Sequence, residues 1–242
     1  MSEVLREEVS IATLADLIGA ARHVAIGAAS PIPAAAALLA RKRHGTRVTL
    51  LHSRRHNSFT DGSRELFDLA GQGRIDVFFL GGVQIDGAAN VNLVGTGDYP
   101  ALDKRFPGSF GSAYLAYVVP RVILFREEHS PRTLVERVDF VSAPGTSSEG
   151  VFRPGGPTHL LTSLALFAFD RARARFRLEA TARGRTAEDV VAATGFAFDL
   201  PEVVPELREP SHDVLAALRG PIARELAESY PEFAARVFAD LA

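Results

Sequence analysis

The sequence predicts an α/β fold in which strands and helices alternate along the chain. A strand, a small-residue turn and a helix follow one another over residues 23–43, and the strand Arg47–Leu51 precedes a helix over residues 62–72. The apolar run Val77–Leu80 is typical of a strand buried on both faces, as in a parallel sheet. With 242 residues and 47% hydrophobic content, the chain is long enough for one sizeable α/β domain or two small ones.

The segment before the first strand predicts an amphipathic helix over residues 11–22. Ser10 is its predicted N-cap, and its apolar residues recur at helical spacing, namely Ile11, Leu14, Leu17 and Ile18. After the strand, Pro31 suits the first turn of the following helix. The turn Gly27–Ser30 therefore either presents backbone N–H groups to an anion or is simply capped. Asp61 is the predicted cap of the helix over residues 62–72.

The second half of the chain predicts further strands and then helices. Apolar runs indicate buried strands at Arg121–Phe125, Val138–Val141 and Leu160–Phe169, and Pro144–Gly150 is a loop and possible subdomain boundary. A strand with one wet face is expected over residues 176–182, joined to the preceding strand by the hairpin turn DRARA. Thr186 is the predicted cap of a helix that ends at Gly195. A final apolar face has helical spacing: Ile222, Leu226, Tyr230, Phe233, Val237 and Leu241.

The stretch Phe78–Asn92 is a candidate ligand loop, because a buried strand ends there on a double glycine. Gly81 and Gly82 allow close backbone approaches that residues with a Cβ resist. The polar residues that follow are Gln84, Asp86, Asn90 and Asn92. Open α/β sheets bind ligands beyond the carboxyl ends of their strands, which favours a ligand at this loop. The alternative is a polar turn whose Asp and Asn side chains bond their own backbone.

A second polar strand end follows Leu51, in the sequence His52-Ser53-Arg54-Arg55-His56-Asn57. Two histidines four residues apart face the same way only on a helix, so a metal site is not expected here. The segment is either a functional strand end or a solvated loop. Further on, residues 105–112 form a glycine-bearing loop that fits neither the dinucleotide fingerprint nor the phosphate-binding P-loop.

Composition excludes several classes of protein. A net charge of −2 lacks the basic excess that nucleic-acid binding requires. The absence of cysteine excludes disulfides, thiolate metal ligands and a cysteine nucleophile. The acidic N-terminus MSEVLREEVS does not resemble a secretion signal, and no apolar run approaches the roughly 20 residues that span a bilayer. We expect a cytoplasmic protein without a nucleic-acid or membrane partner.

The order of several motifs resembles the B subunit of glutaconate CoA-transferase and its relatives in the class I CoA-transferase family. The motifs are FLGGVQIDGAANVN, GDYPALDKRFPGS, VDFVSAPG, the hairpin around FAFD, and TAEDVVAATGFAFDL. The resemblance covers nearly the whole chain. It implies one domain over residues 1–242, with an open, largely parallel CoA-transferase-type (NagB/RpiA-like) sheet flanked by helices and a C-terminal β-hairpin and helices. It also implies a homologous A subunit, an acyl-CoA site at the A–B interface, and coenzyme A as part of the substrate without a permanently bound cofactor.

The chain departs from that family at the residue that defines the reaction. The family's transfer chemistry uses a B-subunit glutamate at the end of an early strand, and the same pattern falls on His52 in VTLLHS. An imidazole cannot form the acyl anhydride, so the resemblance favours branches that decarboxylate an acyl-CoA or hydrolyse a carbon–carbon bond. His52 is then an acid, base or orienting group. The alternatives are genuine CoA transfer with the carboxylate supplied by the A subunit, and a non-catalytic B subunit.

The glycine loop also departs from the family pattern GSGGAN. Here the segment is Gly108-Ser109-Phe110-Gly111-Ser112-Ala113. Phe110 is expected to narrow the space near the thioester oxyanion. The side-chain donor of the family's asparagine is missing, because Ala113 stands at its position. Backbone N–H groups around Gly108, Ser109 and Gly111 are still expected to stabilise a thioester oxyanion. Arg54 or Arg55 is expected either to pair the free carboxylate of a dicarboxylic acyl group or to form a surface pair. Gln84, Asp86, Asn90, Asn92 and the glycines Gly81 and Gly82 are expected mainly to organise their loop, and Ala89 stands where the family usually has glycine.

Overall fold

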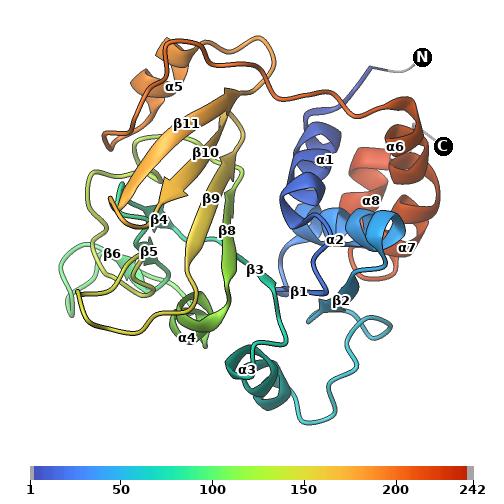
Figure 1. Ribbon diagram of the computed structural model, residues 1–242, viewed down its shortest axis with the longest axis horizontal. Helices are drawn as coiled ribbons and strands as arrows, with labels where there is room; N and C mark the ends of the chain where they lie inside the picture. The colour runs from blue at the N-terminus through green and yellow to red at the C-terminus, as the bar shows by residue number, and fades with distance from the viewer. Residues whose placement is uncertain (1–2, 239–242) are drawn as a thin grey trace. The chain divides into compact units, whose positions relative to one another are not determined.

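The computed structural model describes residues 3–238, and the chain forms two compact units (Figure 1). The first unit comprises the residues up to Leu66, Arg74–Phe79, and the segment from Arg208 onward. The second comprises Phe67–Gly73 and Leu80–Leu207. One functional domain over residues 1–242 stays a prediction.

The first unit is built on three parallel strands. β1 (His23–Ile26) lies between β2 (Arg47–Leu50) and β3 (Val77–Leu80), and every residue of β1 and β3 is buried. Two N-terminal helices, α1 (Arg6–Ile18) and α2 (Pro31–His44), pack against each other. The predicted apolar strand Val77–Leu80 and the strand–turn–helix segment over residues 23–43 are therefore confirmed.

The closing segment of the first unit is helical, as its apolar spacing predicts. It contains α6 (His212–Ala217), a π-helical turn η1 (Leu218–Ile222), α7 (Ala223–Ala227) and α8 (Pro231–Phe238). Its expected inner face is buried at Ile222, Leu226, Phe233 and Val237, whereas Leu241 lies outside the described residues. Both η1 and α7 pack against α2.

The second unit combines one parallel strand pair with an antiparallel hairpin. β8 (Arg121–Arg126) pairs in parallel with β9 (Pro157–Thr162), and β10 (Ala165–Asp170) pairs antiparallel with both β9 and β11 (Arg175–Thr181). Two short hairpins join β4 (Gln84–Ile85) to β5 (Val91–Asn92) and β6 (Gly95–Thr96) to β7 (Lys104–Arg105). The remaining helices are α3 (Ser63–Gly71), α4 (Ser112–Val118) and α5 (Ala187–Ala193). The predicted mostly parallel α/β fold with a β-hairpin is confirmed.

The predicted start of the first helix is wrong. α1 begins at Arg6, five residues before the expected start, and Ser10 is buried within it. Glu8 is fully buried, its carboxylate accepts a hydrogen bond from the Leu5 N–H at 2.9 Å, and it pairs with Arg219 at 2.6 Å. Arg219 is 211 residues away in the sequence, so the local pattern does not reveal it and predicts that Glu8 faces solvent.

Three further local predictions are also corrected. The expected strand Leu160–Phe169 is two strands, because Thr162 Oγ1 accepts hydrogen bonds from the Leu164 and Ala165 N–H groups and reverses the chain. The segment Val138–Val141 is irregular, since side chains rather than a neighbouring strand accept its N–H groups. Asp61 pairs with Arg64 at 2.9 Å instead of capping α3.

The Thr186 cap is confirmed, because its Oγ1 accepts a hydrogen bond from the Asp189 N–H at 3.2 Å. The hairpin turn between β10 and β11 is also where the DRARA segment predicts it. Across residues 3–238, no helix is both long and apolar enough to cross a membrane.

Candidate functional site

The carboxyl ends of the parallel strands in the first unit define a candidate site. β1, β2 and β3 run in the same direction, so the turns that follow β1 and β2 emerge at one edge of this sheet. These turns are Gly27–Ser30 and the segment 51–57, which we call the histidine loop. This edge is where open α/β sheets place their ligands.

Ser53 fixes the conformation of the histidine loop. It is buried, and its Oγ accepts hydrogen bonds from the N–H groups of Arg55 at 3.2 Å and His56 at 3.0 Å. The Leu50 N–H donates to the His56 carbonyl at 3.1 Å, and Asn57 Nδ2 donates to the Leu51 carbonyl at 3.3 Å. The loop is therefore an ordered turn, with the side chains of His52, Arg54 and Arg55 exposed.

His52 and Arg54 lie on the exposed side of this turn. Among residues 3–238, neither has a hydrogen-bond or ion-pair partner, so both are free to bind a ligand. The aromatic contact of His52 within that range is between its ring and the Tyr230 ring, at a centroid distance of 5.6 Å and an interplanar angle of 30°. The Tyr230 hydroxyl donates to the Ala28 carbonyl at 2.8 Å, in the turn after β1. Burial raises the pKa of Tyr230, which keeps the phenol neutral.

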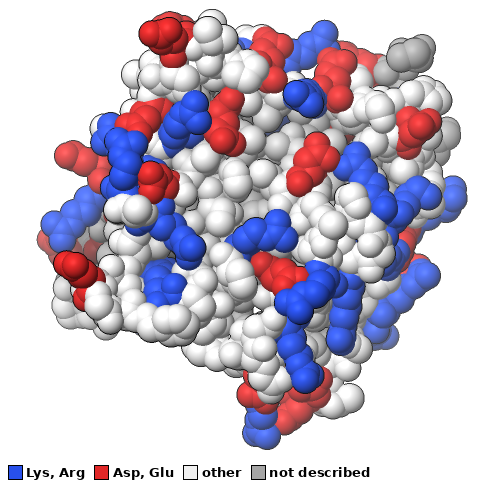
Figure 2. Space-filling view, viewed as in Figure 1, with Lys and Arg blue, Asp and Glu red and all other residues white. Residues whose placement is uncertain are grey.

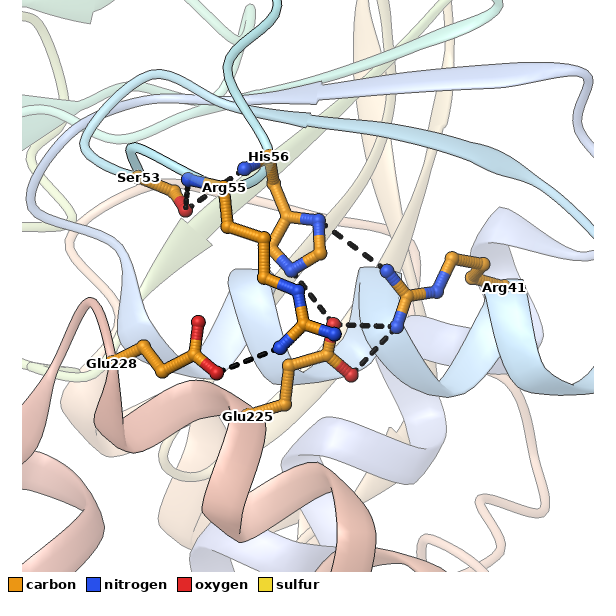
Figure 3. Close-up of polar contacts among 6 residues, drawn as sticks. All are labelled: Arg41, Ser53, Arg55, His56, Glu225 and Glu228. Carbon is orange, nitrogen blue, oxygen red and sulfur yellow. Dashed lines mark hydrogen bonds and ion pairs between the residues drawn. The ribbon is translucent and has the colours of Figure 1, made fainter.

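An ion-pair cluster lies behind the histidine loop (Figure 3). Arg41 Nη2 on α2 donates to both carboxylate oxygens of Glu225 on α7, each at 2.6 Å. His56 Nε2 lies 2.7 Å from Glu225 Oε1, at ion-pair distance but without hydrogen-bond alignment. Arg55 pairs with Glu228 at 2.7 Å. The loop is thus tied to the C-terminal helices by its second arginine and second histidine.

The electrostatics of the cluster favour a neutral His56 beside an ionised Glu225. Burial lowers the pKa of His56 more than the Glu225 carboxylate raises it, and Arg41 and Arg55 lower it further. Burial alone raises the pKa of Glu225, but hydrogen bonding and charge from Arg41 outweigh it, so the pKa is lowered overall. Arg41 is therefore the main partner of Glu225.

These contacts separate residues that the sequence groups together. Arg55 and His56 are engaged internally, whereas His52 and Arg54 are not. Within residues 3–238, no group of three or more His, Cys, Asp or Glu side chains could hold a metal ion. On the face drawn in Figure 2, Lys and Arg side chains predominate over the part of the first unit that holds α2, β2 and α7.

The signature loop, residues 84–92, lies in the second unit and its polar groups are engaged internally. Asp86 is buried, and its carboxylate accepts hydrogen bonds from the N–H groups of Ala88, Asn90 and Val138 and from Asn90 Nδ2, at 3.0–3.4 Å. Gln84 Oε1 accepts from Asn92 Nδ2 at 2.7 Å, and Gln84 Nε2 donates to an Asp139 oxygen at 3.1 Å. The carboxylate and amides of the loop therefore hold neighbouring backbone.

The double glycine before this loop is required by space. A Cβ on Gly81 would lie 2.8 Å from the Phe125 carbonyl oxygen, and one on Gly82 would lie 2.4 Å from Val91 Cγ1. Ala89 has a φ of +58°, in the left-handed region that glycine adopts without strain. The departure at Ala89 is thus tolerated at a conformational cost.

The glycine loop, residues 105–112, leaves backbone donors unused. Within the described part of the chain, no hydrogen-bond acceptor is found for the N–H groups of Gly108, Ser109, Phe110 and Gly111. Phe110 has a φ of +49°, is 76% exposed, and its ring centroid lies 5.6 Å from that of Phe67. A Cβ on Gly111 would lie 2.1 Å from the Phe67 ring, so a larger residue there would require that ring to move. The loop combines free donors with a protruding aromatic ring.

Sequence reasoning missed Arg41, Glu225 and Tyr230 as parts of the site. Glu225 is 184 residues from Arg41, and no local pattern reveals such a pair. Helical spacing assigns Tyr230 only to an apolar helix face. Tyr230 stands directly before Pro231, where α8 begins, and its hydroxyl is a polar group on an otherwise apolar helix face. This hydroxyl is the local signal that Tyr230 does more than fill the core.

The fold and this strand edge define an α/β protein with a candidate ligand site at the carboxyl ends of parallel strands. Residues 11–193 match the model of the coenzyme A transferase family. The chain belongs to that family, as its motifs predict.

Two curated relatives agree with the predicted resemblance. The chain is 34% identical over 161 residues to the B subunit of 3-oxoadipate CoA-transferase from Pseudomonas knackmussii, covering 64% of this chain and 62% of the relative. It is 33% identical over 150 residues to the B subunit of glutaconate CoA-transferase from Acidaminococcus fermentans, covering 59% of this chain and 55% of the relative. The matched part thus spans somewhat more than half the length of each relative.

Solved structures share the fold. The decarboxylase AibA/AibB superposes with a TM-score of 0.78 at 25% identity, covering 90% of this chain and 94% of that chain. Glutaconate coenzyme A-transferase of Acidaminococcus fermentans superposes with a TM-score of 0.77 at 24% identity, covering 89% and 94%. IpdAB of Rhodococcus jostii RHA1 gives a TM-score of 0.78 at 22% identity, covering 90% and 94%.

Proposed function

We propose that this chain is the B subunit of a heteromeric enzyme of the coenzyme A transferase family, paired with a homologous A subunit in the cytoplasm. Its substrate is an acyl-CoA thioester, with coenzyme A as part of the substrate and no permanently bound cofactor. The observation that carries the proposal is His52, an exposed imidazole without a polar partner within residues 3–238, on an ordered turn at the carboxyl end of β2. The named relatives, both B subunits of CoA-transferases, support it.

The acyl group is proposed to be that of a dicarboxylic or keto acid. Glutaconate and 3-oxoadipate, which name the relatives, both carry a second carboxylate. Arg54 is the arginine of the histidine loop that is left free to pair such a carboxylate, since Arg55 is held by Glu228. The basic character of this part of the first unit in Figure 2 supports an anionic ligand.

The chemistry favoured by His52 is decarboxylation or carbon–carbon hydrolysis. In decarboxylation, the bond to the leaving carboxylate breaks, carbon dioxide departs, and the electron pair passes into the enolate of the thioester. A protonated His52 then donates its proton to carbon and recovers one from water. The likeness to the decarboxylase AibA/AibB supports this route. Several of those decarboxylase structures carry replacements of one cysteine, whereas this chain has no cysteine.

The glycine loop is proposed to stabilise the developing oxyanion of the thioester. The unused N–H groups at Gly108, Ser109 and Gly111 are suited to that charge. The residues of the signature loop, including Asn90 and Asn92, are proposed to organise the backbone and not to contact substrate, because their polar groups are already engaged. Gly81 and Gly82, just before the loop, are proposed to organise it because a Cβ has no room there.

A second candidate is genuine CoA transfer, with the nucleophilic carboxylate supplied by the A subunit. The names of the two curated relatives favour it. A third is a B subunit that completes the fold without taking part in the chemistry. Both candidates leave His52 without a chemical role, which separates them from the proposal.

The test uses the complex of this chain with its A subunit. Glutaconyl-CoA and 3-oxoadipyl-CoA are each incubated with radiolabelled acetate, and carbon dioxide, free acids and labelled acetyl-CoA are measured. We expect loss of carbon dioxide or cleavage of the acyl chain without labelled acetyl-CoA, and a loss of several hundredfold in His52→Ala. Labelled acetyl-CoA at the same rate in wild type and His52→Ala would establish transfer in place of the proposed chemistry. Unchanged release of carbon dioxide or cleaved acid in His52→Ala, without labelled acetyl-CoA, would identify a non-catalytic subunit.

A further inference from the structure

Tyr230 lies at the corner between α7 and α8 and is fixed at three points. Its N–H donates to the Leu226 carbonyl at 2.8 Å, and its own carbonyl accepts from the Ala234 N–H at 3.0 Å. Its hydroxyl donates to the Ala28 carbonyl at 2.8 Å. The ring is therefore held between the C-terminal helices and the turn after β1, with its orientation set by the backbone at one end and a hydrogen bond at the other.

His52 meets this fixed ring from the neighbouring strand end. The two ring centroids are 5.6 Å apart at an angle of 30°, within the range of a favourable offset aromatic contact. His52 is exposed and lacks a polar partner among residues 3–238, and its aromatic contact in that range is with Tyr230. An exposed imidazole otherwise samples several rotamers.

The helix segment that carries Tyr230 is attached to the histidine loop as well. Glu225 binds Arg41 and contacts His56, and Glu228 binds Arg55, so ion pairs join this segment to the loop (Figure 3). Three residues within one short stretch of chain thus contact the histidine loop: Glu225 contacts His56, Glu228 pairs with Arg55, and Tyr230 contacts His52. All three lie beyond residues 11–193, the part that matches the family.

We propose that Tyr230 is a positioning residue for His52, holding the imidazole in one orientation at the carboxyl end of β2. Its ring contacts His52 after β2, and its hydroxyl donates to the Ala28 carbonyl in the turn after β1. The ion pairs of Glu225 and Glu228 attach the same segment to the histidine loop. The C-terminal helices therefore contribute to the reactive edge of the first unit. The expected effect of Tyr230 on turnover rests on the proposed function, whereas its expected effect on the orientation of His52 does not.

The geometric test is a proton NMR measurement on the full chain, using the Hε1 resonance of His52 assigned by comparison with His52→Gln. We expect a ring-current displacement of that resonance in wild type and in Tyr230→Phe, which keeps the ring, and its loss in Tyr230→Leu. Tyr99→Leu, which removes an exposed tyrosine of the second unit, is the matched control and should leave the resonance in place. An identical His52 resonance in wild type and Tyr230→Leu would overturn the proposal.

The kinetic test uses the complex with the A subunit and the substrate found active above. We expect Tyr230→Leu to lower kcat about tenfold with KM changed less than about twofold, and Tyr230→Phe to retain about a third or more of kcat. Matched loss in Tyr230→Leu and Tyr230→Phe would contradict a role for the ring.

If His52→Ala is fully active, the proposed function fails while the NMR result still decides the contact. If His52→Ala is inactive and Tyr230→Leu has wild-type kcat, the positioning role fails alone. A circular dichroism spectrum matching wild type confirms that each variant is folded.

Discussion

The signature loop and the histidine loop are both polar turns that follow parallel strands, yet they use their side chains in opposite ways. In the signature loop, Asp86 is 4% exposed and accepts four hydrogen bonds from its surroundings. In the histidine loop, the buried Ser53 performs that organising role, and His52 and Arg54 remain exposed. A conspicuous motif can thus mark architecture, while the neighbouring strand end holds the groups that are free to react.

This difference has a physical basis. A buried carboxylate must be saturated with donors because desolvation is costly, and once saturated it has no capacity left for a ligand. An exposed imidazole keeps its hydration and both ring nitrogens available. Substitutions in the signature loop should therefore change stability most, and substitutions at His52 should change activity most.

The largest effect on stability is expected from Asp86→Ala. The change leaves the N–H groups of Ala88, Asn90 and Val138 without their acceptor, at a cost of about 3 kcal/mol or more in the free energy of unfolding. Urea unfolding of the full chain measures it. Asp98→Ala, at an exposed carboxylate, is the control and should change stability by less than about 0.5 kcal/mol. Equal free energies of unfolding for Asp86→Ala and wild type would contradict a structural role for the signature loop.

A smaller effect is expected from Glu225→Gln, which breaks the support of the histidine loop. Arg41 loses a partner at 2.6 Å, but it is 36% exposed and regains water, so the cost is about 1–2 kcal/mol. The matched control is Asp16→Asn, whose pair with Arg43 at 2.7 Å is more exposed and should matter by less than about 0.5 kcal/mol. If the two substitutions have the same effect on urea unfolding, the cluster behind the loop is an ordinary surface pair.

The smallest effect is the pH dependence of His56. Its pKa in the folded chain is below the ordinary value of 6.5, so the unfolded chain binds more protons in the interval between the two. Stability therefore falls as pH drops from above 6.5 through that interval, whereas the contribution of Glu225, whose pKa is also lowered, is lost only below its ordinary value of 4.5. His56→Gln should flatten the fall in unfolding free energy between pH 7 and pH 5 by less than about 1 kcal/mol. A steeper fall in His56→Gln than in wild type would contradict this assignment.

Much of the fold was predictable because its signals are local. The apolar run Val77–Leu80, the cap at Thr186 and the hairpin turn before Arg175 each depend on a few adjacent residues. The start of α1 and the irregular Val138–Val141 were not predictable in this way. Glu8 is buried by a pair with a distant arginine, and the N–H of Val138 is accepted by Asp86, 52 residues earlier.

The candidate site likewise contains residues that the local sequence predicts and residues that it does not. His52 followed from its position at a strand end, and its exposure agrees with a role in binding or chemistry. Tyr230, which contacts His52, and Glu225, which contacts His56, come from the other end of the chain and are brought to the strand edge only by tertiary packing. Periodicity identified Tyr230 as a core-facing residue but carried no information about the destination of its hydroxyl.

We propose that His52 occupies the position of the family's catalytic glutamate and that the transfer reaction is lost as a result. The most direct test is to restore the carboxylate with His52→Glu, with His52→Gln as the matched neutral control, in the complex with the A subunit. Incorporation of labelled acetate into acetyl-CoA from glutaconyl-CoA is measured. We predict incorporation in His52→Glu and none above background in wild type or His52→Gln. Equal incorporation in wild type and His52→Gln, with no gain in His52→Glu, would contradict the account.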